Sequence, residues 1–509
     1  MTWRCRMGLA LSMLAAGGPA LFGQARSLRA EVEAFVAGRQ RAIVGELVDL
    51  LAIPNVAADR ENIRKNAHAL GVMLAKRGFR TELLETNGNP LVWGEMIVPG
   101  AARTLLLYAH YDGQPVDPKG WKQSSPFAPI LRDGRMEDGA KEISGPIVRD
   151  RYEAGWRVYA RSSSDDKSPI VALLAALDAL RAAGRSPSSN LRIVLDGEEE
   201  AGSPSMVPAI SRYRDRLAAD LMLILDGPVH PSERPTLVFG ARGNLAFELT
   251  VYGPKFGLHS GHYGNWAPNP AMRLAQLLAS MKDEAGRVLI AGFYDGLEPL
   301  TAEERALLDA VPDDPAALQT LFGIAEPENP ALTLQQAVQR PSLNIRGLSS
   351  AYVGAGARTI IPDRAIAAID IRLVKETRAA AMADKLRAHL VHQGYVVVDT
   401  DPDDATRAKH PRIVKLAMRD ATSAYRTSPM APLSRQLATA MERTFGASPV
   451  QIRTSGATVP VAPFIDAMGF PAISVPIVNF DNNQHSENEN LRLGHFFRGI
   501  LALAAALTM

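Results

Sequence analysis

The sequence predicts an α/β protein whose mostly parallel sheet is interrupted by a separate α+β domain. Short apolar runs of strand length alternate with helical patterns between Thr104 and Leu225, which is typical of strand–helix–strand units. The pattern changes after Pro235 and returns from about Thr427, which indicates an inserted domain. The chain of 509 residues is longer than a single hydrophobic core ordinarily supports. A composition of 47% hydrophobic and 22% charged residues is typical of a folded protein.

The individual elements follow from the spacing of apolar residues. Recurrence at helical spacing predicts helices, and short apolar runs predict strands. The elements expected in the first domain are helices over 34–52, 62–77, 168–183 and 491–507, and strands over 104–108, 191–195, 221–225, 236–239 and 472–478. Those expected in the inserted domain are strands over 244–252, 364–374 and 395–398, helices over 270–281 and 377–392, and a Pro-, Asp- and Ala-rich stretch over 283–339. The predicted boundaries are 1–25 for a signal peptide, 26–239 and 427–509 for the first domain, and 240–426 for the insert.

The first 25 residues have the order of a secretory signal peptide. Arg4 and Arg6 precede an apolar run, and small residues follow at Gly23 and Ala25, where cleavage is expected. This order predicts a periplasmic or secreted protein. An uncleaved membrane anchor is the alternative, although the run is short for a bilayer and is broken by glycines and a proline. After cleavage no stable membrane anchor is expected.

Charge and cysteine content narrow the possible functions. Cleavage would remove two arginines and no acid, which takes the formal charge from +2 to zero and leaves no electrostatic basis for nucleic-acid binding. Cys5, the only cysteine, lies in the same segment. Any metal must therefore be held by histidines and carboxylates.

Such side chains follow the ends of the predicted strands, where ligands bind in parallel sheets. The candidate ligands are His110, Asp165, Glu200, Asp226 and His485. Each also has a plainer explanation, such as a helix cap for Asp165, a solvated loop for the glutamate run or a turn for Asp226. Together they are what a two-metal hydrolytic site requires, with Glu199 as a proton-handling base.

The order and spacing of these segments resemble the M20 family of metallopeptidases and deacylases, especially its carnosinase-like dipeptidase branch. The matching motifs are His110-Tyr111-Asp112 with Gln114 to Pro118, Asp165-Asp166-Lys167, Glu199-Glu200-x-Gly202-Ser203, Asp226, and His485-Ser486-x-Asn488-Glu489. The sequence departs from the family pattern at Ala160-Arg161-Ser162 and at Ser168, and residues 132–155 form an extra loop.

The resemblance implies two divalent ions, zinc or alternatively manganese or cobalt. His110 and Asp226 would hold one ion and Glu200 and His485 the other, with Asp165 bridging. Glu199 would be the general base, and Asp112 would orient His110.

The resemblance also implies that the insert is a ferredoxin-like lid and dimerisation domain of a homodimer. In this domain, His259 would stabilise the developing oxyanion. In some members of the family, the histidine of this motif does so in the site of the neighbouring subunit. Arg372 would grip a carboxylate of the substrate, and a loop of the first domain with Gly456 and Thr458 would contact the substrate backbone.

The predicted function is hydrolysis of the amide bond of dipeptides or short peptides. A deacylase of N-acyl amino acids would use the same site. A non-catalytic binding homologue and a two-lobed solute-binding receptor are the alternatives from other classes. The intact base and ligand set favours catalysis.

Overall fold

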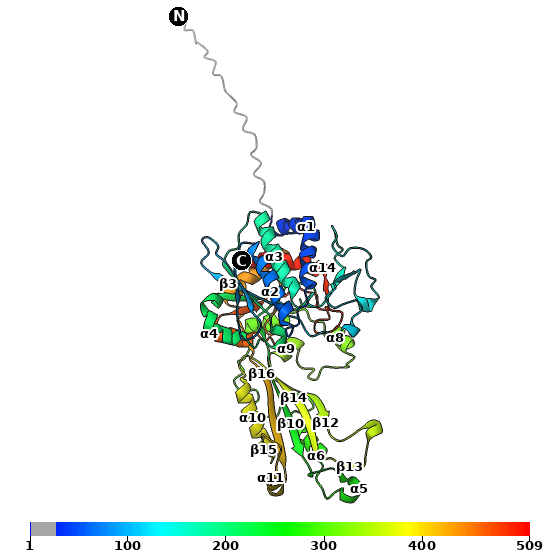
Figure 1. Ribbon diagram of the computed structural model, residues 1–509. Helices are drawn as coiled ribbons and strands as arrows, with labels where there is room; N and C mark the ends of the chain where they lie inside the picture. Colours follow the sequence, from blue (N-terminus) through cyan, green and yellow to red (C-terminus); the bar gives the residue numbers. More distant parts are fainter. Residues whose placement is uncertain (2–26) are drawn as a thin grey trace.

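The computed structural model describes Met1 and residues 27–509, and it consists of two bodies that each contain a β-sheet (Figure 1). The larger body holds an eight-stranded sheet, and the smaller one extends from it around a five-stranded sheet. The predicted signal peptide lies outside the described residues, apart from Met1. Among the described helices, none combines the length and apolarity that crossing a bilayer requires.

The centre of the eight-stranded sheet is parallel. In spatial order its strands are β1 (Arg80–Leu84), β2 (Leu91–Met96), β6 (Asn190–Asp196), β3 (Thr104–His110), β7 (Leu221–Ile224), β19 (Ala472–Ser474), β8 (Thr236–Val238) and β18 (Val450–Ile452). Strands β6, β3, β7 and β19 run parallel, while β1 and β2 are antiparallel additions at one edge. The carboxyl ends of β3, β6 and β7 therefore lie together at one edge of the sheet.

Helices cover both faces of this sheet because side chains of the central strands alternate between two apolar cores. Leu105 and Leu107 of β3 face one core, and Leu106 and Tyr108 face the other. The first core is covered by α1 (Leu28–Leu51), α2 (Arg60–Ala75), α3 (Lys167–Ala182), α12 (Pro432–Phe445) and α14 (Leu493–Leu507). The second is covered by α4 (Met206–Leu217) and α13 (Ala462–Met468).

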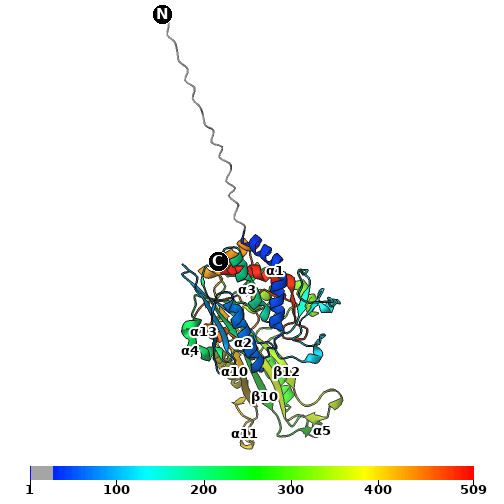
Figure 2. The ribbon, with the colours of Figure 1, turned by 45° about the horizontal axis from the view of Figure 1, so that its top comes forward.

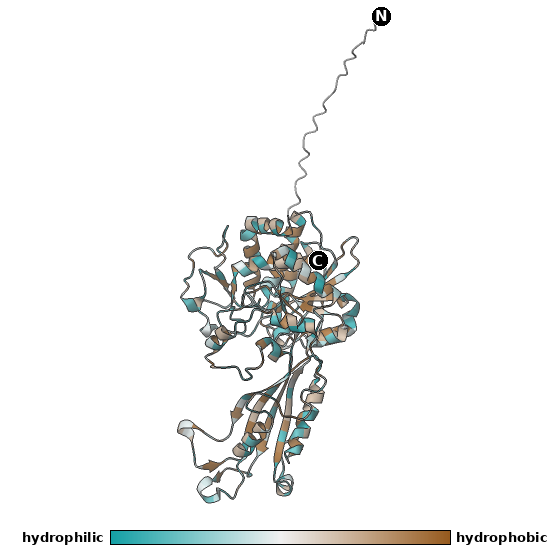
Figure 3. Cartoon of the chain, turned by 180° about the vertical axis from the view of Figure 1, so that it is seen from behind, coloured by the Kyte–Doolittle hydropathy of each residue, from teal (hydrophilic) through white to brown (hydrophobic). Residues whose placement is uncertain are grey.

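The five-stranded sheet of the smaller body has one apolar and one polar face. Its strands, in spatial order, are β12 (Ser342–Ser349), β14 (Arg364–Leu373), β10 (Gly243–Tyr252), β16 (Ile413–Thr422) and β15 (Val396–Val398). Helices α6 (Pro270–Ala279) and α10 (Ala379–His392) pack on the apolar face through leucines and Met382. Figure 3 shows the apolar residues of these strands in brown. At the far end lie α5 (Ser260–Tyr263), β11 (Leu258–His259) and β13 (Ile360–Ile361), as both Figure 1 and Figure 2 show.

The predicted fold class is confirmed, whereas the predicted domain boundaries stay a prediction. The elements that the sequence did not predict have weak patterns. Strand β1 is a short edge strand with polar residues, and α4 is mostly polar. The stretch 283–339 contains three short helices, α7 (Ala302–Asp309), α8 (Pro315–Phe322) and α9 (Leu334–Val338). Capping boxes begin α7 at Thr301 and α9 at Thr333, and this local signal was available in the sequence.

Candidate metal centre

Three neighbouring strands position half of the candidate site. His110 is the last residue of β3, Glu199 begins a short 3₁₀ turn after β6, and Asp226 follows β7 by two residues. Asp165 comes just before α3. His485 lies in the loop between β19 and β20 (Asn490–Arg492). These segments converge at the carboxyl edge of the sheet, where parallel strands place their ligands.

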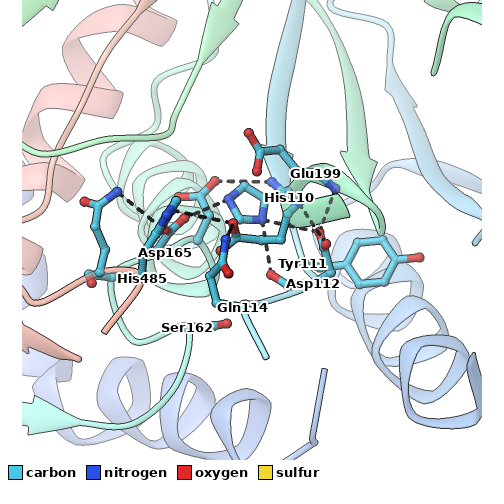
Figure 4. Close-up of polar contacts among 12 residues, drawn as sticks. His110, Tyr111, Asp112, Gln114, Ser162, Asp165, Glu199 and His485 are labelled. Carbon is cyan, nitrogen blue, oxygen red and sulfur yellow. Dashed lines mark hydrogen bonds and ion pairs between the residues drawn. The ribbon is translucent and has the colours of Figure 1, made fainter. Parts of the chain in front are cut away.

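The five predicted ligands are brought together with a sixth residue, Asp166. His110, Asp166 and Asp226 form one group, and Asp165, Glu200 and His485 form a second, with the ligand atoms of each group within 4.8 Å of one another. Asp165 connects the groups, because its Oδ1 lies 2.9 Å from Nε2 of His110 and its Oδ2 lies 3.1 Å from Nε2 of His485. Figure 4 shows this carboxylate between the two imidazole rings. Asp166 had no predicted role, because an acid adjacent to a proposed ligand carries no signal of its own.

The donor set fits a pair of divalent cations. Oδ1 of Asp166 and Oε1 of Glu200 are buried and, within the described part of the chain, have no hydrogen-bond partner. A buried carboxylate oxygen left without a partner is costly, so these atoms are expected to have a ligand. Imidazole and carboxylate donors suit zinc, manganese and related ions.

The acids of the site repel one another in the absence of a cation. Burial, followed by the charges of Asp226, Asp165 and Glu200, raises the pKa of Glu199 well above its usual value. Burial and the charge of Asp165 raise the pKa of Glu200 to about 7 and that of Asp226 to about 6. Burial also opposes ionisation of Asp165, but hydrogen bonds from both imidazoles outweigh it and lower the pKa of this carboxyl. Positive charge in either ligand group would relieve the repulsion.

Asp112 holds both His110 and the turn that carries Glu199. Its two carboxylate oxygens accept the backbone N–H groups of Glu199 and Glu200, each at 3.0 Å. The Nδ1 atom of His110 lies 3.1 Å from the Asp112 carbonyl oxygen and 3.4 Å from its Oδ1. These contacts direct Nε2 of His110 toward the other candidate ligands. A metal-bound imidazole is usually held by such a contact at its second ring nitrogen.

Glu489 holds the turn that presents Asp165. It is fully buried, and its Oε2 accepts from Arg161 Nη1 at 2.8 Å and from the Ser162 N–H at 2.9 Å. Its Oε1 accepts from the N–H groups of Ser164 and Asp165, both at 2.9 Å. The Arg161–Glu489 pair therefore fixes the backbone in the segment where this sequence departs from the family pattern.

Replacing Glu489 by Gln should weaken metal binding and lower stability. The amide would place an N–H₂ group against N–H donors and leave the buried Arg161 unpaired, a kind of change that costs about 3–5 kcal/mol. Urea unfolding and metal titration would measure both effects. Glu487→Gln is the matched control, because Glu487 lies two residues away and is exposed. Unchanged metal affinity in Glu489→Gln would contradict this role.

The predicted substrate-binding residues of the two bodies meet at their junction. Arg372 of β14 donates from Nη1 to Oγ1 of Thr458 at 2.8 Å. Gly456 is exposed in the same loop as Thr458. His259, in contrast, is exposed at the far tip of the smaller body beside His262, so within one chain it does not join the ligand groups (Figures 1 and 2).

The extra loop over residues 132–155 runs along the loop that carries His485. Oε1 of Glu137 accepts a hydrogen bond from Nδ2 of Asn483 at 2.7 Å. The flanking strands β4 (Ile130–Arg132) and β5 (Arg157–Tyr159) form a three-stranded sheet with β20. Arg157 of β5 pairs with Asp481 at 2.7 Å. The loop and its strands thus support one side of the candidate site.

The model of peptidase family M20/M25/M40 matches residues 142–509, which include every candidate ligand except His110. The chain belongs to this family. The predictions of the family and of a metallopeptidase are therefore confirmed.

Relatives match along most of the chain. The Cys-Gly metallodipeptidase of Candida albicans is 26% identical, with 91% of this chain and 93% of the relative covered. The Beta-Ala-His dipeptidase of Homo sapiens is 26% identical, with 82% and 76% covered. The M20 family metallo-carboxypeptidase of Sulfolobus solfataricus has a TM-score of 0.72 at 28% identity, with 91% and 98% covered. Human carnosine dipeptidase 1 has a TM-score of 0.70 at 23% identity, with 95% and 99% covered, and shows the same fold.

The predicted secreted or periplasmic location is wrong. The yeast Cys-Gly metallodipeptidases, which match 91% of this chain in both Candida albicans and Saccharomyces cerevisiae, are cytosolic enzymes. The prediction depended on a short charged, apolar and small-residue pattern alone. Such a pattern is a compositional signal, and few residues are needed to produce it.

Proposed function

We propose that this protein is a two-metal dipeptidase that cleaves the amide bond of dipeptides or other short peptides. The observation that carries the proposal is the Asp165 carboxylate, whose two oxygens lie at 2.9 and 3.1 Å from imidazoles of two different ligand groups. That arrangement suits a carboxylate that bridges two cations. The names of the relatives, Cys-Gly and Beta-Ala-His dipeptidases, support a dipeptide substrate.

His110, Asp226 and Asp166 would hold one ion and Glu200 and His485 the other, with Asp165 shared. When bound, a pair of divalent ions polarises the amide carbonyl and lowers the pKa of a water molecule. Zinc is the first candidate, and manganese and cobalt are alternatives with the same donors.

Glu199 would act as the general base and then as the general acid. Its backbone is fixed by Asp112, and its side chain lies outside both ligand groups. It accepts a proton from the attacking water and delivers that proton to the leaving amine nitrogen. Glu199 must be ionised to accept the proton, and positive charge in the ligand groups favours that form.

His259 has a role only if a second copy of the chain is present. Its exposure at the tip of the smaller body supports a homodimer in which it reaches the partner's site and stabilises the developing oxyanion. Light scattering should give the molar mass of a dimer at the protein concentration of the activity assay. A monomer with full activity would exclude this part of the proposal.

The activity test combines metal analysis with a substrate panel. Purified protein should contain about two divalent ions per chain and should hydrolyse free dipeptides faster than N-acyl amino acids. A preference for N-acyl amino acids would favour the deacylase alternative, which uses the same residues. Metal-loaded protein that cleaves no amide would overturn the proposed function.

A further inference from the structure

His485 is the most exposed of the candidate ligands. Its side chain is 58% exposed, whereas those of His110 and Asp165 are 0% and 5% exposed. Its Nε2 contacts Asp165 and Glu200, but within the described chain its Nδ1 has no hydrogen-bond partner. A histidine that ligates a metal is usually held at its second ring nitrogen, as His110 is by Asp112. The direction of the His485 ring is therefore set by the backbone of its loop.

The His485 loop, residues 481–490, has a backbone that needs support. Asn483 and His485 have φ angles of 56° and 61°, in the left-handed region that few residues other than glycine adopt. Such residues persist only where the surrounding structure holds them. One contact from outside is the Lys122 N–H, which donates to Oδ1 of Asn488 at 2.9 Å. The others come from β5 and from the extra loop before it.

The two ends of the His485 loop are joined by one buried arginine. Arg157 of β5, the strand that follows the extra loop, is 6% exposed. Its Nη2 donates to Oδ2 of Asp481 at 2.7 Å, and its Nη1 donates to the Asp481 carbonyl oxygen at 3.2 Å. Its Nη1 also donates to Oδ1 of Asn490 at 2.8 Å. Arg157 therefore closes the loop at its base.

The extra loop holds the His485 loop near its apex. Oε1 of Glu137 accepts from Nδ2 of Asn483 at 2.7 Å. Glu137 lies in a 3₁₀ turn whose first residue, Met136, donates its N–H to the hydroxyl of Tyr159 at 2.8 Å. Tyr159 is a fully buried residue of β5. The turn is thereby anchored to the strand that also closes the base of the loop.

We infer that the extra loop and β5 together position His485, and that they set the affinity of the second ligand group for its cation. Glu137 and Arg157 are the positioning residues. The first ligand group is carried by the ends of β3 and β7 and by the start of α3, so its affinity should not depend on these contacts. This inference rests on the proposed pair of divalent ions and assigns the control of one of them.

The test titrates metal-free protein with zinc in competition with a chromophoric chelator and yields one Kd for each ion. The group that contains the exposed His485 should be the weaker site. Glu137→Ala should raise the larger Kd about tenfold and leave the smaller Kd unchanged, since residues behind a metal ligand contribute about tenfold to a hundredfold to affinity. Arg157→Lys should raise the larger Kd by more. Glu137→Ala alters an exposed side chain, so its melting temperature in chelator should equal that of wild type.

Further variants separate position from charge. Glu137→Gln keeps an oxygen that accepts from Asn483, so it should bind both ions like wild type. Asn483→Gly removes the donor but suits the left-handed backbone, and it should match Glu137→Ala. The double variant of Glu137→Ala and Asn483→Gly should be no weaker than either single variant, because both remove the same contact. Glu142→Ala removes an exposed acid of the same loop and serves as the charge control.

The outcomes distinguish this inference from the proposed function. An unchanged larger Kd in Glu137→Ala, equal weakening of both ions, or additive losses in the double variant would overturn the inference and leave the proposed function in place. A Glu137→Gln variant as weak as Glu137→Ala would overturn it too, because charge rather than position would then govern the affinity. A wild type that binds fewer than two zinc ions would instead contradict the proposed two-metal site.

Discussion

Glu199→Gln is expected to abolish turnover while the protein keeps its metal and its fold. General acid–base catalysis contributes about 10²- to 10⁴-fold to rate, and glutamine cannot accept the proton. Metal should be retained because the side chain of Glu199 lies outside both ligand groups. The backbone N–H, which Asp112 accepts at 3.0 Å, is present in either residue. The measurements are kcat, metal content by elemental analysis and the melting temperature.

The matched control for this substitution is Glu198→Gln. Glu198 is the preceding residue, and its Oε1 accepts the Asn89 backbone N–H at 2.9 Å, away from the ligand groups. It should keep most of the activity of wild type. Loss of metal together with activity in Glu199→Gln would mean that Glu199 is a ligand. Retained activity would exclude it as the base.

The strands that carry the site could be predicted because they are buried on both faces. Strands β3, β6 and β7 read as short apolar runs, so their ends, and the acids and histidine that follow them, were visible in the sequence. The five candidate ligands are dispersed along the chain, and no local pattern assigns them to one site. Only the resemblance of their order to that of a family indicated that they belong together. The distances that bring Asp165 to both His110 and His485 required the fold.

The contacts of other residues could not be predicted, for a different reason. Glu489 holds the Asp165 turn from 324 positions away, and nothing local in the sequence distinguishes it from an exposed loop acid. Arg242 looks like any arginine before a strand, and its burial depends on contacts with β12 about a hundred residues later. The proposed role of His259 lies in the site of a partner subunit, which a single chain does not contain. Long-range partners, rather than local patterns, define all three.

Removing the metal should destabilise the protein, and the loss should grow as the pH rises from 5 to 8. The pKa of Glu200 is about 7 in the folded chain against 4.5 for the free side chain, and that of Asp226 is about 6 against 3.8. At pH values between the ordinary pKa and the raised pKa of each carboxyl, the folded state of the metal-free protein therefore binds more protons than the unfolded state. The free energy of unfolding consequently falls as the pH rises through this interval. The hydrogen bond to Asp165 raises the pKa of His485. The stabilisation that protonated His485 gives the folded state is therefore also lost as the pH rises above the ordinary pKa of 6.5. Bound cations compete with these protons and reverse the trend.

Glu200→Gln distinguishes this electrostatic cause from general damage to the site. In metal-free protein at pH 8 the variant should be more stable than wild type, because it lacks a buried carboxylate whose ionisation costs on the order of 3 kcal/mol. At pH 5 the carboxylate of wild type is protonated, so the advantage should disappear. With metal present the order should reverse, because a ligand is missing. Urea unfolding at both pH values, with chelator and with zinc, measures all four comparisons. A variant that is less stable than wild type in chelator at pH 8 would show that repulsion among the buried acids does not govern the metal-free state.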